Sequence, residues 1–249
     1  VMLEAMRAAA EAGLPIFDHT EDDSLPGTAA GEACMAARDL VLARESGAAL
    51  HLCHISAKLS LDCIRAAKAA GYSVTAETAP HYFTFDETCA ADGNFKMNPP
   101  LRSRADREAL VAGLQDGTIE VIATDHAPHT AAEKARGLAG SAMGVVGLEC
   151  AFAVLNTALV GRGIISFARL VEAMAVAPRR IFSLGGGTIA AGEPADLTAV
   201  DTERAGTVDP DRFLSMGRST PFAGMAVRGE VMLTLVGGRE AYRNGDLKR

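Results

Sequence analysis

The sequence contains no Cys-x-x-Cys pair, and its five cysteines, an odd number, are scattered along the chain. A disulfide framework or a cysteine-based zinc module needs paired, regularly spaced cysteines, so neither is expected. We interpret each thiol as a small buried apolar group and predict a reducing, cytoplasmic location.

Long apolar runs and basic clusters are also missing. No stretch of about 18 apolar residues and no charged-then-apolar leader occurs, so no segment is expected to span a membrane or direct export. The net charge is −7 and Lys and Arg form no run, which argues against nucleic-acid or anionic-membrane partners and favours a small-molecule ligand. The first residue is Val, and residues 1–12 have helical composition without a capping residue, so the chain is expected to be part of a longer protein.

The sequence does contain a repeated helix, glycine and strand pattern within residues 1–130. Each helical stretch ends at a glycine and leads into a short apolar run, which is typical of parallel βα units. The glycines are Gly13, Gly47, Gly71 and Gly117, and the runs are residues 14–17, 48–53, 72–76 and 118–124. Metal-ligand residue types follow these runs, at Asp18-His19, His54, Glu77 and Asp125. Since no Gly-x-Gly-x-x-Gly motif follows a strand, the pattern favours a (β/α)8 barrel over a doubly wound sheet.

Polar groups are densest at residues 124–129, Thr-Asp-His-Ala-Pro-His, directly after an apolar run. Asp followed by His and Pro cannot continue a strand, so Asp125 and His129 are predicted on a loop at the sheet's edge, where barrel enzymes carry out their chemistry. The alternative for this stretch by itself is an ordinary turn in which Asp125 caps the next segment and His129 is solvated.

His51 and His54 lie on one predicted strand, and side-chain alternation allows only one of them to point into a barrel mouth. We expect His54, at the strand's end, to do so, and His51 to pack beneath a helix. With His19 and Asp125, His54 forms a set of nitrogen and oxygen ligands that suits zinc or another borderline divalent ion.

Two loops and a C-terminal segment complete the expected organisation. Residues 94–104 contain two consecutive prolines beside Asn98, and this rigid loop could recognise a polar, acidic small molecule; the alternative is a surface turn with Arg102 and Arg104 in water. Residues 130–144 are predicted to form a mobile loop over the site. Helices are expected at 147–160 and 166–177, the second ending at Pro178. The predicted domains are residues 1–185, a barrel part, and residues 186–249, a small β appendage.

Several motifs, in their order and spacing, resemble those of bacterial-type dihydroorotases of the amidohydrolase superfamily. They lie at residues 19–22, 51–56, 75–81, 96–102, 124–129 and 147–149, while residues 192–197 and 219–222 resemble the family's C-terminal β-sandwich. Asn-Pro-Pro-Leu-Arg and Thr-Asp-His-Ala-Pro-His favour dihydroorotase over allantoinase and hydantoinase. The resemblance covers nearly all of the chain.

The resemblance implies a zinc-dependent enzyme, with one or two ions, that reversibly hydrolyses the cyclic amide of dihydroorotate to N-carbamoyl-L-aspartate in de novo pyrimidine biosynthesis. The implied metal ligands are His19, His54 and Asp125, and Asp125 is also the implied catalytic proton-transfer residue. The implied substrate-binding groups are Asn98, His129 and the backbone of Met143 and Gly144. His81 and Tyr82 stand where the family usually has two histidines, and both are interpreted as structural.

One departure from the family is large, because no histidine precedes His19. The family begins with a strand carrying His-x-His and an Arg, and it supplies a carboxylated Lys or an Asp that bridges two metals. Only about four of the eight barrel strands are found. The predicted fold is therefore α/β, a partial (β/α)8 TIM barrel of C-terminal units with a small C-terminal β-sandwich appendage, and this chain alone is expected to be inactive.

Two other functions remain open. One is a non-catalytic dihydroorotase homologue that scaffolds aspartate transcarbamoylase, and the other is a different cyclic amidase such as an allantoinase or hydantoinase. Besides the small-molecule substrate, the expected partners are a second copy in a homodimer or aspartate transcarbamoylase.

Overall fold

The computed structural model describes residues 1–248, which form two compact units. The first unit comprises Val1–Gly147 with Ser215–Pro221, and the second begins with Leu148–Leu214 and resumes at Phe222. Within residues 1–248, no helix has both the length and the apolar composition needed to cross a membrane.

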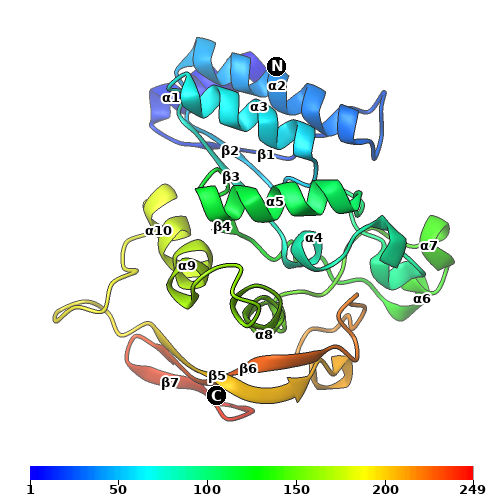
Figure 1. Cartoon of the computed structure of the whole chain (residues 1–249). Helices are drawn as coiled ribbons and strands as arrows, with labels where there is room; N and C mark the ends of the chain where they lie inside the picture. Colours follow the sequence, from blue (N-terminus) through cyan, green and yellow to red (C-terminus); the bar gives the residue numbers. More distant parts are fainter. Residues whose placement is uncertain (249) are drawn as a thin grey trace. The chain divides into compact units, whose positions relative to one another are not determined.

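A parallel sheet organises the first unit, with its strands in the order β1-β2-β3-β4 (Figure 1). The strands are β1 (Ile16–Asp18), β2 (Leu50–Leu52), β3 (Val74–Thr78) and β4 (Val121–Ile122). In the register of the sheet, Leu50 lies between Ile16 and Val74. The predicted succession of parallel βα units is thereby confirmed.

Helices connect these strands and pack with the sheet to bury its apolar side chains. They are α1 (Met2–Ala12), α2 (Ala29–Ser46), α3 (Lys58–Ala69) and α5 (Arg104–Asp116), each in contact with the next. Side chains from both layers are fully or almost fully buried, among them Leu50, Leu52, Leu61, Ile64 and Leu114. Burial of each such side chain stabilises the fold by about 1.5–3 kcal/mol, so this layer positions the strand ends firmly.

Three of the four glycines predicted to end helices do so, whereas Gly71 follows Ala70, the residue that caps α3. Gly13, Gly47 and Gly117 cap α1, α2 and α5 with φ of 66°, 74° and 83°. This left-handed conformation is easily adopted by glycine and strained for other residues, so the chain can leave each helix and turn directly into the next strand.

Short helices lie within the loops at the carboxyl edge of the sheet. After β3 come α4 (Pro80–Thr84), η1 (Glu87–Cys89) and η2 (Gly93–Phe95), and after β4 come α6 (Ala131–Lys134) and α7 (Gly137–Gly140). Helix α6 begins with a capping box between Thr130 and Glu133. The segment 130–144, predicted to be a mobile loop, is therefore partly helical.

The second unit contains two irregular helices and an antiparallel sheet. The first helix runs from α8 (Ala151–Leu155) into the π-helical η3 (Asn156–Val160), and the second comprises α9 (Phe167–Val171), the π-helical η4 (Glu172–Val176) and α10 (Ala177–Ile181). Pro178 does not end the second helix, contrary to expectation. It lies in the first turn of α10, after the π-helical segment, where a missing N–H is tolerated.

The strands of the second unit are β5 (Leu197–Thr207), β6 (Ala226–Val236), β7 (Arg239–Arg243) and β8 (Asp246–Leu247), with η5 (Pro210–Arg212) after β5. They form one antiparallel sheet in the order β5-β6-β7-β8. Helices α8, α9 and α10 belong to the same compact unit as this sheet. The boundary between the two units therefore comes earlier in the chain than the predicted domain boundary at residue 185. The domains 1–185 and 186–249 stay a prediction.

Candidate functional site

Polar side chains gather where the strands of the parallel sheet end. His19 follows β1, His54 follows β2, Glu77 lies in β3, and Asp125 follows β4. Because parallel strands end at the same edge of a sheet, these four groups share that edge. His54 and Asp125 both have positive φ, 37° and 47°. A non-glycine residue in this region costs about 1–3 kcal/mol and is found mostly at functional sites, so the backbone itself points to this edge.

The side chains of His19 and His54 face each other. Nδ1 of His19 lies 3.0 Å from Nε2 of His54, and the ring centroids are 4.7 Å apart. Two imidazole nitrogens bound to one tetrahedral zinc ion, with Zn–N near 2.0–2.1 Å, would be about 3.4 Å apart, which is close to this separation. Burial, and then the nearby charge of His19, lowers the pKa of His54. The neutral imidazole, which is the form that binds a metal, is therefore favoured.

Asp125 is a half-buried carboxyl group at the same edge. Its burial, followed by the negative charge of Glu77, raises the pKa of Asp125 to about 6, while His19 acts in the opposite direction. A carboxyl group with a pKa near neutrality can both accept and release a proton at physiological pH. This electrostatic setting suits the proton-transfer role predicted for Asp125.

Asp125 does not complete a compact set of three ligand atoms with His19 and His54. Within residues 1–248, the set of His, Cys, Asp or Glu ligand atoms that all lie within 4.8 Å of one another consists of His51, Cys53 and Glu77. The structure thus brings the two predicted histidine ligands together and leaves the carboxylate farther away.

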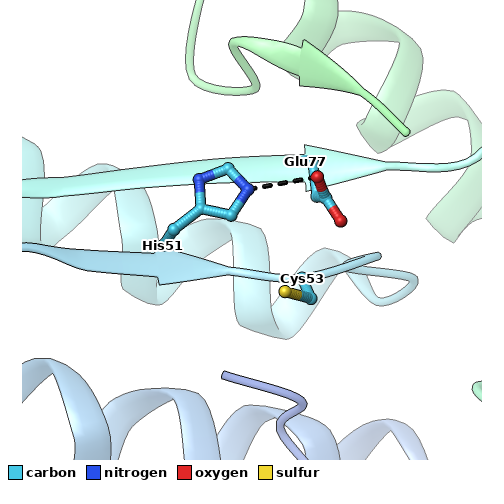
Figure 2. Close-up of side chains that lie close together, drawn as sticks. All are labelled: His51, Cys53 and Glu77. Carbon is cyan, nitrogen blue, oxygen red and sulfur yellow. Dashed lines mark hydrogen bonds and ion pairs between the residues drawn. The ribbon is translucent and has the colours of Figure 1, made fainter. Parts of the chain in front are cut away.

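The three residues of this set come from neighbouring strands (Figure 2): His51 lies on β2, Cys53 directly follows β2, and Glu77 lies on β3. Nδ1 of His51 lies 2.8 Å from Thr75 Oγ1, and Nε2 lies 3.1 Å from Glu77 Oε2, as the dashed line in Figure 2 shows. Burial, and then the charge of Glu77, raises the pKa of the Cys53 thiol to about 12. An ion on Nε2 of His51 would have to break its hydrogen bond with Glu77, and an ion on Cys53 would need the thiolate that this high pKa disfavours. We therefore interpret these three side chains as part of a hydrogen-bonded core. The sequence predicted that His51 packs beneath a helix, and in the structure its ring is hydrogen-bonded to the adjacent strand, β3.

Asn98 lies beside the histidine pair and is joined to it by Glu21. Glu21 Oε2 accepts a hydrogen bond of 2.7 Å from Asn98 Nδ2 and lies 3.1 Å from His19 Nε2. These bonds, that from Asn98 first, lower the pKa of Glu21. Metal-binding histidines commonly donate their second ring N–H to such a carboxylate. Sequence reasoning did not identify Glu21; its place two residues after His19 was the available signal.

The two arginines of the 94–104 loop differ: Arg104 is exposed, as the surface-turn alternative expected, whereas Arg102 is not in water. Arg102 is largely buried and donates to Gly27 O at 2.5 Å and to Ser56 Oγ at 2.9 Å, with Glu32 at 3.4 Å. Arg104 is exposed and pairs with Glu108 in α5. Arg102 therefore fixes the loop that carries Asn98 to the body of the unit.

His129, Met143 and Gly144 lie together, as the predicted substrate-binding role requires. His129 Nε2 donates to Met143 O at 2.8 Å, and the Met143 side chain is exposed. Gly144 has φ of 135°, and a side chain there would collide with Ala127. Only glycine fits this position, so the backbone at 143–144 can lie directly against the loop that follows Asp125.

Comparison with known proteins supports the resemblance found in the sequence. The dihydroorotase of Brevibacillus brevis is 46% identical over 98% of this chain and 62% of its own length, and that of Lactiplantibacillus plantarum is 46% identical over 97% and 61%. The solved structure of an L-hydantoinase (dihydropyrimidinase) from Arthrobacter aurescens matches all of this chain and 61% of its own, with a TM-score of 0.91 at 27% identity.

The chain thus spans about 62% of the length of these relatives. The model of the amidohydrolase family matches residues 1–241, nearly the whole sequence. The strand-edge histidines, the strained Asp125 and this match agree, and the chain belongs to the amidohydrolase family.

Proposed function

We propose that the protein containing this chain is a dihydroorotase, which reversibly hydrolyses the cyclic amide of dihydroorotate to N-carbamoyl-L-aspartate. The observation that carries the proposal is the pair of facing imidazole nitrogens of His19 and His54, 3.0 Å apart at the same strand edge as Asp125. The identities of 41–46% to proteins named dihydroorotase support this substrate over the hydantoins.

The same similarity supports a finer proposal for the fold. The parallel sheet and its helices would be the C-terminal units of a (β/α)8 barrel, and the antiparallel sheet would be part of a β-sandwich. The TM-score of 0.91 to the hydantoinase supports this arrangement. A barrel places the carboxyl ends of its strands around one axis, which is what catalysis by His19, His54 and Asp125 requires.

His19 and His54 would hold a zinc ion through the two facing nitrogens, and the complete site would hold one or two ions. Bound zinc supplies a Lewis acid that polarises the amide carbonyl and lowers the pKa of water to about 7. Asp125 would be a further ligand, would take the proton of the attacking water and would deliver it to the leaving ring nitrogen. Ring closure in the biosynthetic direction would reverse these steps.

Asn98, His129 and the backbone of Met143 and Gly144 would bind and orient the substrate. The amide of Asn98 lies within 3.4 Å of His19 Nε2, so a group bound there is next to the metal ligands. Fixed polar groups of this kind supply the proximity that makes hydrolysis effectively intramolecular.

Substitution of Asp125 in the full-length gene product tests the proposal. We expect Asp125→Asn and Asp125→Ala to lower kcat at least ~10³-fold while circular dichroism stays unchanged. Asp62→Asn is the matched control, because Asp62 is an exposed carboxylate that pairs with Lys58 on α3. A kcat near that of the wild type in either Asp125 variant would exclude the assigned role.

A substrate panel separates dihydroorotase from the other cyclic amidases. We expect kcat/KM for dihydroorotate to exceed that for hydantoin and allantoin by at least ~10²-fold, because a site built to hold the substrate's polar groups rejects analogues that lack them. Equal activity on hydantoin would favour a hydantoinase. A homodimer or an aspartate transcarbamoylase complex stays a prediction, as does a scaffolding role, which requires no turnover at all.

A further inference from the structure

The ammonium group of Lys134 is held in a cage of backbone carbonyls. Lys134 ends α6 and is only 7% exposed. Its Nζ donates to Lys96 O at 2.9 Å, to Ala142 O at 2.9 Å and to Gly144 O at 2.8 Å. An ammonium group has three donors, so the cage uses all of them.

The three carbonyls belong to two segments that carry proposed substrate-binding groups. Lys96 lies two residues before Asn98, while Ala142 and Gly144 flank Met143. One further bond joins the same segments directly, from Gly144 N to Lys96 O at 3.0 Å. Lys134 therefore ties the backbone at 142–144 to the loop that presents Asn98.

The backbone of Lys134 is fixed as firmly as its side chain. Ser141 Oγ donates to Lys134 O at 2.8 Å, and a side chain at Gly93 would collide with that same carbonyl and with Ser141 Oγ. The start and end of the segment 134–144 thus close on each other. A stretch rich in Ala and Gly, expected from the sequence to be mobile, therefore makes specific contacts at both of its ends.

Such an arrangement has a specific energetic consequence. Hydrogen bonds from a charged donor are stronger than those between neutral groups, and a buried carbonyl left without its partner is destabilised. Removing the ammonium would take away three hydrogen bonds on two segments at once, leaving Ala142 O and Gly144 O without this donor while Lys96 O keeps its bond from Gly144 N. The segment 142–144 would then be held less firmly relative to Asn98, with the bond from Gly144 N to Lys96 O remaining.

We propose that Lys134 is a positioning residue for substrate binding: its ammonium holds the backbone of residues 142–144 against the Asn98 loop, so that both are preorganised around the substrate ring. The proposal rests on the proposed function, because it takes the backbone of Met143 and Gly144 as substrate-binding. Lys134 itself touches neither substrate nor metal ligand; it acts through the two segments that it joins.

The test uses the full-length gene product, loaded with zinc, with Lys134→Met as the main variant. Methionine keeps the length of the side chain and removes its donors. We expect KM for dihydroorotate to rise at least ~10-fold with kcat within about threefold of wild type, because binding is lost and the reacting groups are intact. Zinc content should stay unchanged, and amide hydrogen exchange at residues 141–146 should become faster.

Two further variants make the outcome decisive. Lys58→Met removes an exposed lysine charge on α3 and should leave KM, kcat and exchange unchanged. Ser141→Ala removes the bond to Lys134 O and should raise KM about threefold, which decides the matter if Lys134→Met does not fold. Unchanged KM in the variants that fold, or a joint loss of zinc and kcat without a rise in KM, would overturn the proposal.

Hydrogen exchange separates this inference from the proposed function. If the wild-type protein fails to hydrolyse dihydroorotate, the proposed function fails, and the exchange of residues 141–146 still reports whether Lys134 orders them. If exchange there is the same in Lys134→Met and wild type, the cage does not hold the segment and this inference is wrong even in an active dihydroorotase.

Discussion

Glu21 joins a predicted metal ligand to a predicted substrate-binding residue. Its carboxylate contacts both His19 Nε2 and Asn98 Nδ2, and Oε1 accepts a hydrogen bond from Gly27 N at 3.3 Å. A carboxylate in this position fixes the tautomer and the orientation of the imidazole, so that Nδ1 is left to face His54. Glu21 is therefore expected to act on zinc affinity without binding zinc itself.

Glu21→Ala should lower the zinc affinity of the full-length gene product about 10–100-fold, because an unsupported imidazole is a poorer and less oriented ligand. Competition with a chromogenic chelator measures this. The control is Asp22→Ala, since the Asp22 carboxylate accepts bonds from Ser24 and lies next in the sequence. Equal zinc affinity in Glu21→Ala and Asp22→Ala would show that Glu21 does not support the site.

His81 makes the fold sensitive to acid. It is fully buried, and neither ring nitrogen has a hydrogen-bond partner within residues 1–248. Burial, and then the charge of His54, lowers the pKa of His81 to about 3. The unfolded chain has a histidine pKa near 6.5, so between pH 6.5 and 3 only the unfolded state binds this proton, and stability falls as the pH falls.

His81→Phe should remove this pH dependence and keep the ring that packs on Tyr82, with centroids 4.2 Å apart in the wild type. At pH 5 the wild type should have lost about 2 kcal/mol through His81 relative to pH 8, and the variant should not. Urea unfolding at both pH values measures the difference. Identical pH slopes in the two proteins would contradict the assignment.

At the scale of elements, Asp106 connects the N-termini of two helices. It forms a capping box with Ser103 at the start of α5, and its Oδ1 accepts a 2.8 Å hydrogen bond from Lys58 N at the start of α3. One side chain thus accepts hydrogen bonds from backbone N–H groups at the starts of two helices, where such groups have no partner within the helix. This contact joins α3 and α5, the helices that precede β3 and β4, and the ends of these strands contribute to the candidate site.

Asp106→Ala should lower the free energy of unfolding by about 1–2 kcal/mol, because the bonds that its carboxylate accepts from Ser103 N and Lys58 N are lost. Glu108→Ala on the same helix should change it by less than about 0.5 kcal/mol, since the exposed pair with Arg104 contributes little. Chemical denaturation of both variants makes the comparison. A loss in Asp106→Ala no larger than in Glu108→Ala would mean that the caps are not stabilising.

At the scale of the whole chain, apolar surface and strand edges are left uncovered. β1 and β4 end the strand order of the parallel sheet, and Phe17 on β1 is 54% exposed. Unpaired edges and exposed apolar side chains promote association. Of the predicted metal ligands His19, His54 and Asp125, the last does not lie within a compact set with the other two among the described residues.

We therefore expect residues 1–249, produced alone, to aggregate readily, to bind zinc weakly and to show no measurable hydrolysis of dihydroorotate. Zinc analysis, size-exclusion chromatography and an activity assay test this, with the full-length gene product as the positive control. A soluble monomer with stoichiometric zinc and a turnover of ~1 per second or more would show the expectation to be wrong.

The sequence by itself determined the order of the helices and strands of the first unit and the positions of the candidate site residues after the strands. A helix that ends at a glycine such as Gly47 and a strand that ends shortly before Asp125 are set by local backbone preferences, which adjacent residues reveal. Parallel strands then place His19, His54 and Asp125 at one edge without any knowledge of packing.

Only the tertiary structure decided which atoms meet at that edge. His19 faces His54 across 35 residues, Glu21 binds Asn98 across 77, and Arg102 turns inward to Gly27 across 75. Such contacts depend on register, rotamers and the route of loops, which leave no local pattern. For the same reason the sequence, which predicts a mobile loop over the site at residues 130–144, does not reveal the carbonyl cage of Lys134 in that segment.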